Sequence, residues 1–292
     1  MKRIGYYKSC SLNASSKDYS RSLEMAFSKL SADLVTLEDW NCCGASSAHA
    51  TNELLGLALP ARNLALAEEQ GLTTLMAPCS ACYTRLLATA DKLRRDDAAT
   101  AEVNEVLHPL SYLGTVQVKN ILEILWNEVG ADDILRAKKK DLKGMRIACY
   151  YGCYLTRTPG VDCSDDRENP QAMDNLVRLL GGEPVDWPYK TDCCGAGFQA
   201  IESSYSVQLC EKLMEMASQV GVDAIVATCP LCQTNLDLNQ DWLKREKGID
   251  YNMPVFFITD LLGLAFGCNL GNTQWRKHFV NPNKLFDRYA LR

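Results

Sequence analysis

Short apolar runs alternate with longer amphipathic stretches along most of the chain. In the first half, this pattern predicts strands over 3–7, 34–37 and 72–77, with helices over 18–30, 52–70 and 80–93. In the second half, it predicts strands over 145–150 and 224–227, helices over 171–180 and 201–220, a helix after 229, an extra strand over 255–258 and a helix over 260–266. Strands that alternate with helices predict an α/β fold with parallel sheets, in which ligands bind at the carboxyl ends of the strands.

The same arrangement of five cysteines occurs in each half. The two sets are Cys10, Cys42, Cys43, Cys79 and Cys82, and Cys153, Cys193, Cys194, Cys229 and Cys232. Both read C-x(31 or 39)-C-C-G-x(33 or 34)-C-x-x-C. An internal repeat of this length predicts two similar domains, each with a small parallel sheet flanked by helices.

The region between the two repeats predicts the domain boundary. Residues 96–142 lie outside the cysteine pattern and are predicted to form a helical insertion, with helices over 99–107 and 118–129. A lysine-rich turn over 138–144 ends this region. We therefore expect an N-terminal domain over 1–143, which includes the insertion, and a C-terminal domain over 144–292.

Composition and charge narrow the function classes. The 292 residues are 47% apolar and 23% charged, which is typical of a globular protein with a sizeable core. A net charge of −5 gives no basic surface, so nucleic acid is not expected as a partner. The longest apolar run, 254–267, is short and interrupted by polar residues, and the first residues have no apolar run, so neither a membrane span nor a signal peptide is predicted.

The fourteen cysteines favour metal or redox chemistry in a reducing compartment, because no export signal accompanies them. We therefore expect a cytoplasmic protein. In a Cys-x-x-Cys at a strand-to-helix turn, both sulfurs point to one side, next to the free N–H groups of the helix. Two adjacent cysteines can serve one centre only where the backbone turns, and a following glycine permits that turn.

Five thiols per half exceed the four that a structural zinc or a cubane iron–sulfur cluster requires. Zinc at the two Cys-x-x-Cys pairs leaves six patterned cysteines unexplained, and a thioredoxin-like dithiol does not need the Cys-Cys-Gly segments. Outside the pattern, Cys149 and Cys210 are expected to be core residues, Cys163 is a doubtful additional ligand, and Cys268 has no predicted role. His49 could line the first site, although a hydrogen-bonding or surface role is favoured.

At these cysteines the sequence resembles the cysteine-rich CCG-domain family, and within it the B subunit of heterodisulfide reductase (HdrB). The resemblance spans nearly the whole chain and includes the neighbourhoods Tyr151-Gly152-Cys153, Cys193-Cys194-Gly195-Ala196-Gly197 and Thr228-Cys229-Pro230-Leu231-Cys232. Tyr154 stands where methanogen members are expected to carry histidine, and residues 45–50 are rich in Ser and Ala. Related proteins occur in bacterial complexes, including sulfur-oxidising ones linked to lipoate-binding proteins, so the substrate need not be the methanogen disulfide.

The resemblance implies a noncubane four-iron, four-sulfur cluster on each set of five cysteines, with a disulfide reduced or reversibly formed between the two clusters. It also implies a ferredoxin-like HdrC-type subunit, a flavin-containing HdrA-type subunit, and a disulfide or thiol substrate that includes protein-bound lipoate among its candidates. The sequence has no Gly-rich nucleotide or flavin motif, so electrons are expected from a partner. The alternative is an electron-transfer protein that relays electrons to or from a partner and has no substrate site of its own.

Overall fold

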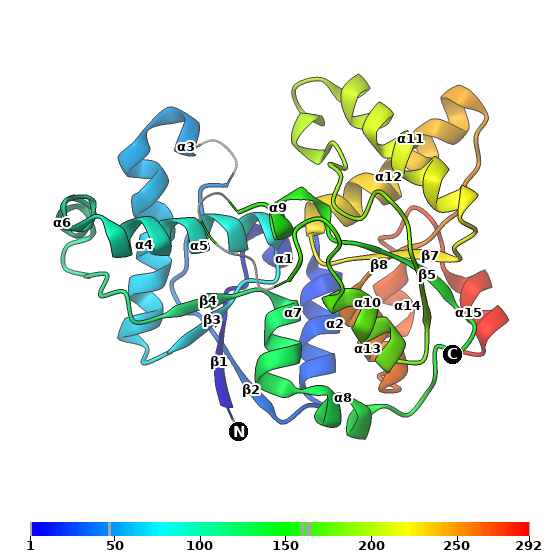
Figure 1. Ribbon diagram of the computed structural model, residues 1–292, viewed down its shortest axis with the longest axis horizontal. Coiled ribbons are helices and arrows are strands. Elements are labelled where there is room, and N and C mark those ends of the chain that lie inside the picture. Colours follow the sequence, from blue (N-terminus) through cyan, green and yellow to red (C-terminus); the bar gives the residue numbers. More distant parts are fainter. Residues whose placement is uncertain (1, 46–47, 159–160, 162–164, 292) are drawn as a thin grey trace.

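Two four-stranded parallel sheets organise the computed structural model, which describes residues 2–45, 48–158, 161 and 165–291 (Figure 1). The first sheet has the order β2-β1-β3-β4, and the second has the order β6-β5-β7-β8. The strands are β1 (Lys2–Tyr6), β2 (Ala32–Thr36), β3 (Thr74–Met76), β4 (Gln117–Lys119), β5 (Arg146–Tyr150), β6 (Glu183–Val185), β7 (Ala224–Ala227) and β8 (Val255–Phe257). All neighbouring strands are parallel, so the predicted α/β class with two similar domains is confirmed.

Helices flank the first sheet. They are α1 (Cys10–Asn13), α2 (Lys17–Phe27), α3 (Ala48–Thr51), α4 (Glu53–Glu69), α5 (Ser80–Arg95), α6 (Asp97–Leu107), α7 (Ile121–Glu123), the π-helix η1 (Ile124–Val129) and α8 (Ala131–Ala137). The long helix α4 begins after Asn52, whose side-chain oxygen accepts a hydrogen bond from Leu55 N at 2.8 Å. Such a cap satisfies one of the N–H groups that the first helical turn leaves free.

The second sheet is flanked in the same way. Its helices are α9 (Gly152–Thr156), α10 (Ala172–Leu179), the short 3-10 helix η2 (Ala196–Phe198), α11 (Ser203–Gln219), α12 (Pro230–Lys247), α13 (Ile258–Ala265), α14 (Gly271–Trp275) and α15 (Asn283–Tyr289). Pro230 opens α12, where its missing N–H costs no helical hydrogen bond, and Gly248 ends it with a left-handed φ of 69°. Strands β7 and β8 are buried along their whole length, as expected for a parallel sheet covered on both faces.

The segment 96–142 is not purely helical, which corrects the predicted insertion. Residues 117–119 form β4, which pairs with β3 and completes the first sheet, and the helix predicted from 118 begins only at Ile121. Asn120 separates the two elements because its side chain accepts hydrogen bonds from Leu122 N and Glu123 N and so caps α7. Strand β8 is therefore the counterpart of β4 and not an addition to the second half.

A further strand, in addition to β4, was not predicted. Strand β6 spans three residues at the edge of the second sheet and contains Pro184. A proline is tolerated at an edge because one side of the strand needs no partner, but it also removes the sequence signal of a strand.

Each domain packs the helix that follows its last strand against the other domain (Figure 1). Helix α13 lies along α2, where the hydroxyls of Ser22 and Thr259 are 2.6 Å apart. Reciprocally, Trp126 of η1 donates its indole N–H to the carbonyl of Ala172 in α10 at 2.9 Å. This exchange fixes the two sheets relative to each other and brings their cysteine-bearing loops to one interface.

Candidate metal centres

The ten patterned cysteines lie at the carboxyl ends of the first three strands of each sheet. After β1, β2 and β3 come Cys10, the pair Cys42 and Cys43, and the pair Cys79 and Cys82. After β5, β6 and β7 come Cys153, the pair Cys193 and Cys194, and the pair Cys229 and Cys232. Because the carboxyl ends of parallel strands share one edge, residues far apart in sequence meet there.

In the first set, the thiols contact one another in a chain. The Sγ atoms of Cys43 and Cys82 lie 3.1 Å apart, and Cys82 also shares a hydrogen bond with Cys79. Hydrogen bonds from the thiols of Cys42 and Cys82 lower the pKa of Cys43 to about 3. Cys10 stands close enough to interact electrostatically with Cys42. The five thiols of the first half therefore lie in one neighbourhood, linked by hydrogen bonds and, for Cys10, by an electrostatic interaction.

The second set repeats this arrangement. The Sγ atoms of Cys194 and Cys232 lie 3.4 Å apart, and Cys232 shares a hydrogen bond with Cys229. The thiol of Cys153 donates to Cys193 and lowers the pKa of Cys193 to about 6. Cys153 also interacts electrostatically with Cys194 and Cys229, so the same five positions of the repeat again lie in one neighbourhood.

The two sets meet across the domain interface. The thiols of Cys79 and Cys229 are close enough to share a hydrogen bond. Next to them, the hydroxyls of Ser80 and Thr228 are 3.3 Å apart and buried. The two sites are therefore neighbours and not separate centres at opposite ends of the molecule.

Each set has a buried side and an open side. Three thiols of each set are buried: Cys43, Cys79 and Cys82 in the first, and Cys194, Cys229 and Cys232 in the second. Cys10, Cys42 and Cys193 are exposed, and Cys153 is half-buried. A group held by the buried thiols would thus remain accessible from one direction.

Glycine makes the turn at the paired cysteines. Gly44 and Gly195 have φ angles of 74° and 84°, in the left-handed region where other residues are strained. The backbone N–H of each glycine donates to the sulfur two residues earlier, Cys42 and Cys193, at 3.4 Å in both cases. At Gly195 there is also no room for a side chain, because a Cβ would lie 2.8 Å from Ser206 Cα.

Two tyrosines that the sequence analysis missed support the paired cysteines. Tyr7 donates its hydroxyl to the carbonyl of Asn41 at 2.7 Å, and Tyr150 donates to the carbonyl of Asp192 at 2.6 Å. Asn41 and Asp192 directly precede the two cysteine pairs. Burial raises the pKa of both phenols, so they remain protonated donors. The signal was present in the sequence, since both tyrosines stand three residues before the first cysteine of their set.

Two asparagines also hold these segments. Asn63 in α4 accepts from Asn41 N at 2.9 Å and donates to the carbonyl of the same residue at 3.1 Å. Asn235 in α12 donates to the carbonyl of Cys194 at 2.7 Å. Their positions in the two halves do not correspond, so the repeat could not reveal them.

The described cysteines outside the pattern occupy buried or half-buried positions. Cys149 in β5 and Cys210 in α11 are fully buried, as expected for core residues. Cys268 is half-buried, and its sulfur lies 3.6 Å from the carbonyl of Met25. Cys163, named as a doubtful ligand, lies outside the described residues, and so does the side chain of His49, which belongs to α3.

The donor set fits an iron–sulfur cluster by its chemistry. Each set consists only of sulfur, with backbone N–H groups directed at it and the first turn of a long helix beside it, all of which favour thiolates. Within the described residues, no three His, Cys, Asp or Glu side chains surround a point as ligands of a single metal ion. Over the same residues, no helix is long and apolar enough to cross a membrane.

Fold and site together define a protein with two cysteine-rich α/β domains. The family model of the cysteine-rich domain, CCG, matches residues 4–87 and 147–237. The chain therefore belongs to the cysteine-rich CCG domain family, and the predicted resemblance is confirmed.

Curated relatives match along nearly their whole length. The 8-methylmenaquinol:fumarate reductase membrane anchor subunit of Wolinella succinogenes is 31% identical over 289 residues, which are 97% of this chain and 99% of that protein. The B subunit of the ferredoxin/F420H2-dependent CoB-CoM heterodisulfide reductase of Methanosarcina acetivorans is 29% identical over 91% of this chain and 90% of that protein. A protein of Archaeoglobus profundus that is named as similar to the heterodisulfide reductase B subunit is 28% identical over 91% of each chain.

A solved structure shares the fold. The crystal structure of a hypothetical protein from Helicobacter pylori superimposes with a TM-score of 0.77 at 16% identity, and the match covers 96% of this chain and 52% of that chain. At this identity the likeness concerns the fold alone.

Proposed function

We propose that this chain is the catalytic iron–sulfur component of a heterodisulfide reductase-like complex. Its reaction is the reduction, or reversible formation, of a disulfide between two noncubane four-iron, four-sulfur clusters. The observation that carries this proposal is that two equivalent sets of five thiols meet at one interface, where the hydroxyls of Ser80 and Thr228, next to Cys79 and Cys229, are 3.3 Å apart. The names of the HdrB-type relatives support the same reaction class.

In this proposal the ten patterned cysteines are the cluster ligands. Cys10, Cys42, Cys43, Cys79 and Cys82 hold one cluster, and Cys153, Cys193, Cys194, Cys229 and Cys232 hold the other. When bound, the clusters supply electrons one at a time to a disulfide, which consumes two electrons and two protons to give two thiols. The buried thiols anchor each cluster, while the open side of each set admits the substrate.

The proposed partners follow from what the chain lacks and from its relatives. The sequence has no nucleotide or flavin motif, so a ferredoxin-like HdrC-type subunit and a flavin-containing HdrA-type subunit would provide the electrons. A disulfide or thiol, protein-bound lipoate among the candidates, would be the substrate. We place the protein in the cytoplasm because its open thiols require a reducing compartment.

A second candidate function is favoured by the match to the Wolinella succinogenes protein over 99% of its length. In that case the chain relays electrons within a quinol:fumarate reductase-like complex, and a partner holds the substrate site. The adjacent thiol sets suit this role too, since neighbouring clusters exchange electrons readily.

Anaerobic metal analysis followed by electron paramagnetic resonance separates these functions. The full chain should contain about eight irons with matching acid-labile sulfide. Under oxidising conditions, an added thiol should then produce a new paramagnetic signal. Iron without any response to thiols would support the relay function, and zinc in place of iron would overturn both.

A further inference from the structure

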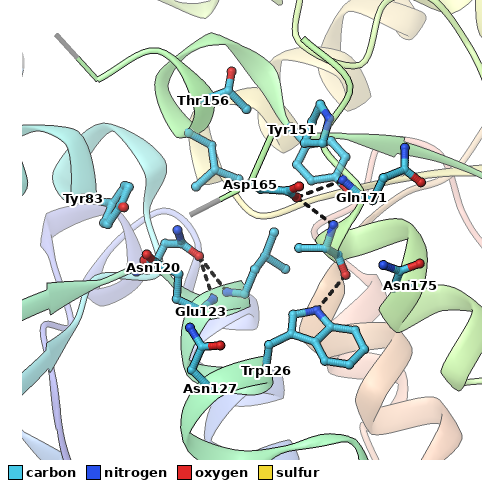
Figure 2. A pocket seen from close by; sticks show the side chains of 14 residues that line it. Tyr83, Asn120, Glu123, Trp126, Asn127, Tyr151, Thr156, Asp165, Gln171 and Asn175 are labelled. Carbon is cyan, nitrogen blue, oxygen red and sulfur yellow. Dashed lines mark hydrogen bonds between the residues drawn. The ribbon is translucent and has the colours of Figure 1, made fainter. Parts of the chain in front are cut away.

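A cavity of about 280 Å³ lies between the domains (Figure 2). The first domain contributes Tyr83 of α5, Asn120 and the residues of α7 and η1 that include Trp126. The second domain contributes Tyr151, residues of α9 and the start of α10. Its volume is near the lower end for small-molecule sites, so it suits a short organic arm and not a nucleotide.

The cavity touches the elements that carry ligands from both sets. Tyr83 directly follows Cys82, and α9 includes Cys153. Helices α5 and α9 are tied together by Thr84, whose hydroxyl donates to the carbonyl of Tyr154 at 2.6 Å. No patterned cysteine is among the described residues that line the cavity, but its wall includes residues next to or two positions from a cysteine of each set, Tyr83 beside Cys82 and Tyr151 near Cys153.

No lysine, arginine or histidine is among the described residues that line this cavity, whereas two carboxylates are. Glu123 accepts from Asn120 N at 2.7 Å, and Asp165 accepts from Gln171 N and Ala172 N at 2.8 and 2.7 Å. The buried Lys190 does not offset their negative charge, because it forms an ion pair with Asp174 at 2.9 Å outside the cavity wall. The Arg178 guanidinium next to the wall donates to Asn175 at 2.7 Å. Because the charged side chains of the described wall itself are carboxylates only, the wall disfavours a sulfonate, phosphate or carboxylate.

The remaining wall combines apolar side chains with hydroxyls and amides, and two of its amides have groups without a partner in the described part of the chain. The indole N–H of Trp126 is already bonded to Ala172, so its ring offers only an apolar face. The side-chain NH2 of Asn120 and the whole amide of Asn127 have no hydrogen-bond partner among the described residues. In Figure 2 these two side chains extend from the α7–η1 side of the cavity. They can pair with an amide or hydroxyl of a ligand.

We propose that this cavity binds the uncharged, amide-bearing arm of the substrate, so that the substrate class is a neutral organic disulfide or dithiol and not an anionic one. This inference rests on the proposed disulfide chemistry for the substrate's identity. The choice between neutral and anionic arms rests on the cavity alone.

Lipoamide and lipoate provide a matched pair of probes, because they carry the same cyclic disulfide and differ only in a terminal amide or carboxylate. Binding of each to the full-length, cluster-containing chain should be measured anaerobically by calorimetry. We expect lipoamide to bind about tenfold more tightly or better at neutral pH, because the cavity carboxylates oppose lipoate. Equal binding, or tighter binding of lipoate, would overturn the proposal.

Two variants test the location. Asn127→Lys adds a cation at the exposed edge of the cavity and should shift the preference toward lipoate by about tenfold, whereas Asn281→Lys adds the same charge elsewhere and should leave it unchanged. Asn120→Asp keeps the helix cap but removes the free donor, so lipoamide binding should weaken. A preference that both cavity variants leave unaltered would place the binding elsewhere and refute the assignment.

The two proposals can fail separately. Lipoamide and lipoate could give the same thiol-dependent paramagnetic signal and bind with equal affinity. That result would refute the cavity assignment and still support the disulfide chemistry. Selective lipoamide binding that Asn127→Lys reverses, without any spectral response, would support the cavity as a neutral-ligand site and reject the disulfide reaction.

Discussion

The hydroxyl groups of Ser80 and Thr228 lie 3.3 Å apart although the residues are separated by 148 positions. Each directly adjoins the first cysteine of a Cys-x-x-Cys pair, Cys79 or Cys229. The contact therefore shows that the two halves of the repeat face each other through equivalent loops. Predictions about one half can accordingly be checked against the other.

Loss of a patterned cysteine should halve the iron content. Cys194→Ala removes a buried thiol of the second set only, so iron should fall from about eight to about four per chain. Disulfide turnover should also be lost, while the fold survives. Metal analysis, an activity assay and circular dichroism measure these effects.

The matched control is Cys210→Ala, which removes a buried thiol outside the pattern. This variant should keep its full iron content. Equal losses of iron in both variants would mean that removing any buried thiol disturbs the core enough to release iron. The loss in Cys194→Ala could then not be assigned to a missing ligand.

The tyrosines that support the cysteine pairs should matter for stability. Tyr150→Phe removes the donor to the carbonyl of Asp192 and should lower the free energy of unfolding by about 1 kcal/mol. The rate at which iron is lost to a chelator should rise, because the segment before Cys193 is held less firmly. Denaturant unfolding and chelator kinetics measure the two effects. Tyr205→Phe changes an exposed phenol and should alter neither, and a Tyr150→Phe protein that behaves like it would refute the supporting role.

In the turn that follows Cys193 and Cys194, glycine should be required at position 195 but not at position 197. Gly195→Ala places a Cβ against the backbone of Ser206 at a left-handed φ, so strain of about 1 kcal/mol or more adds to a clash that side chains cannot relieve. Gly197→Ala meets nothing within 4 Å. Thermal unfolding and iron content should therefore drop in the first variant only. Similar unfolding temperatures and iron contents in the two variants would show that the backbone accommodates a side chain at position 195 without loss of stability.

His278 should make the protein sensitive to acid. Burial lowers its pKa to about 4, and neither ring nitrogen has a hydrogen-bond partner among the described residues. Below the unfolded pKa of about 6.5 the unfolded state binds a proton that the folded state does not, so stability falls as the pH drops from about 6.5 to about 4. The loss reaches at most about 1.4 kcal/mol per pH unit.

Replacing His278 by Phe, which suits neighbours such as Trp275 and Phe256, should remove this dependence. The nearby Asp237, whose pKa burial raises to about 7, titrates in both proteins and cancels in the difference. Denaturant titrations at several pH values measure the two slopes. If the free energy of unfolding depended on pH in the same way in wild type and variant, protonation of the buried His278 would cost the folded protein no stability, and the prediction would be wrong.

Much of the architecture could be predicted from the sequence because the repeat carries it. The positions of the ten cysteines at strand ends follow from the alternation of strands and helices, and Cys149 and Cys210 are core residues as expected. Strand β4 was misread because Val118 continues an apolar pattern into α7, and only the cap at Asn120 divides them. Strand β6 has too few residues, and a proline among them, to give a periodic signal.

Parts of the site depend on contacts that no local pattern shows. The pairing of Cys79 with Cys229 results from the reciprocal packing of α13 on α2 and of η1 on α10. The cavity arises from side chains such as Tyr83 and Trp126 that come from different segments and meet residues of the other domain. Neither periodicity nor cysteine spacing contains that information.

The division of each cysteine set into a buried and an open side also governs how the protein is made and damaged. In the first set the thiols open to solvent are Cys10 and Cys42, and in the second Cys193 is exposed and Cys153 is half-buried, so iron would meet these thiols first. Oxygen reaches the same thiols first. Cofactor assembly, oxidative loss and substrate entry therefore share one approach to each centre, and a partner that covers this approach would protect the protein from air while it blocks turnover.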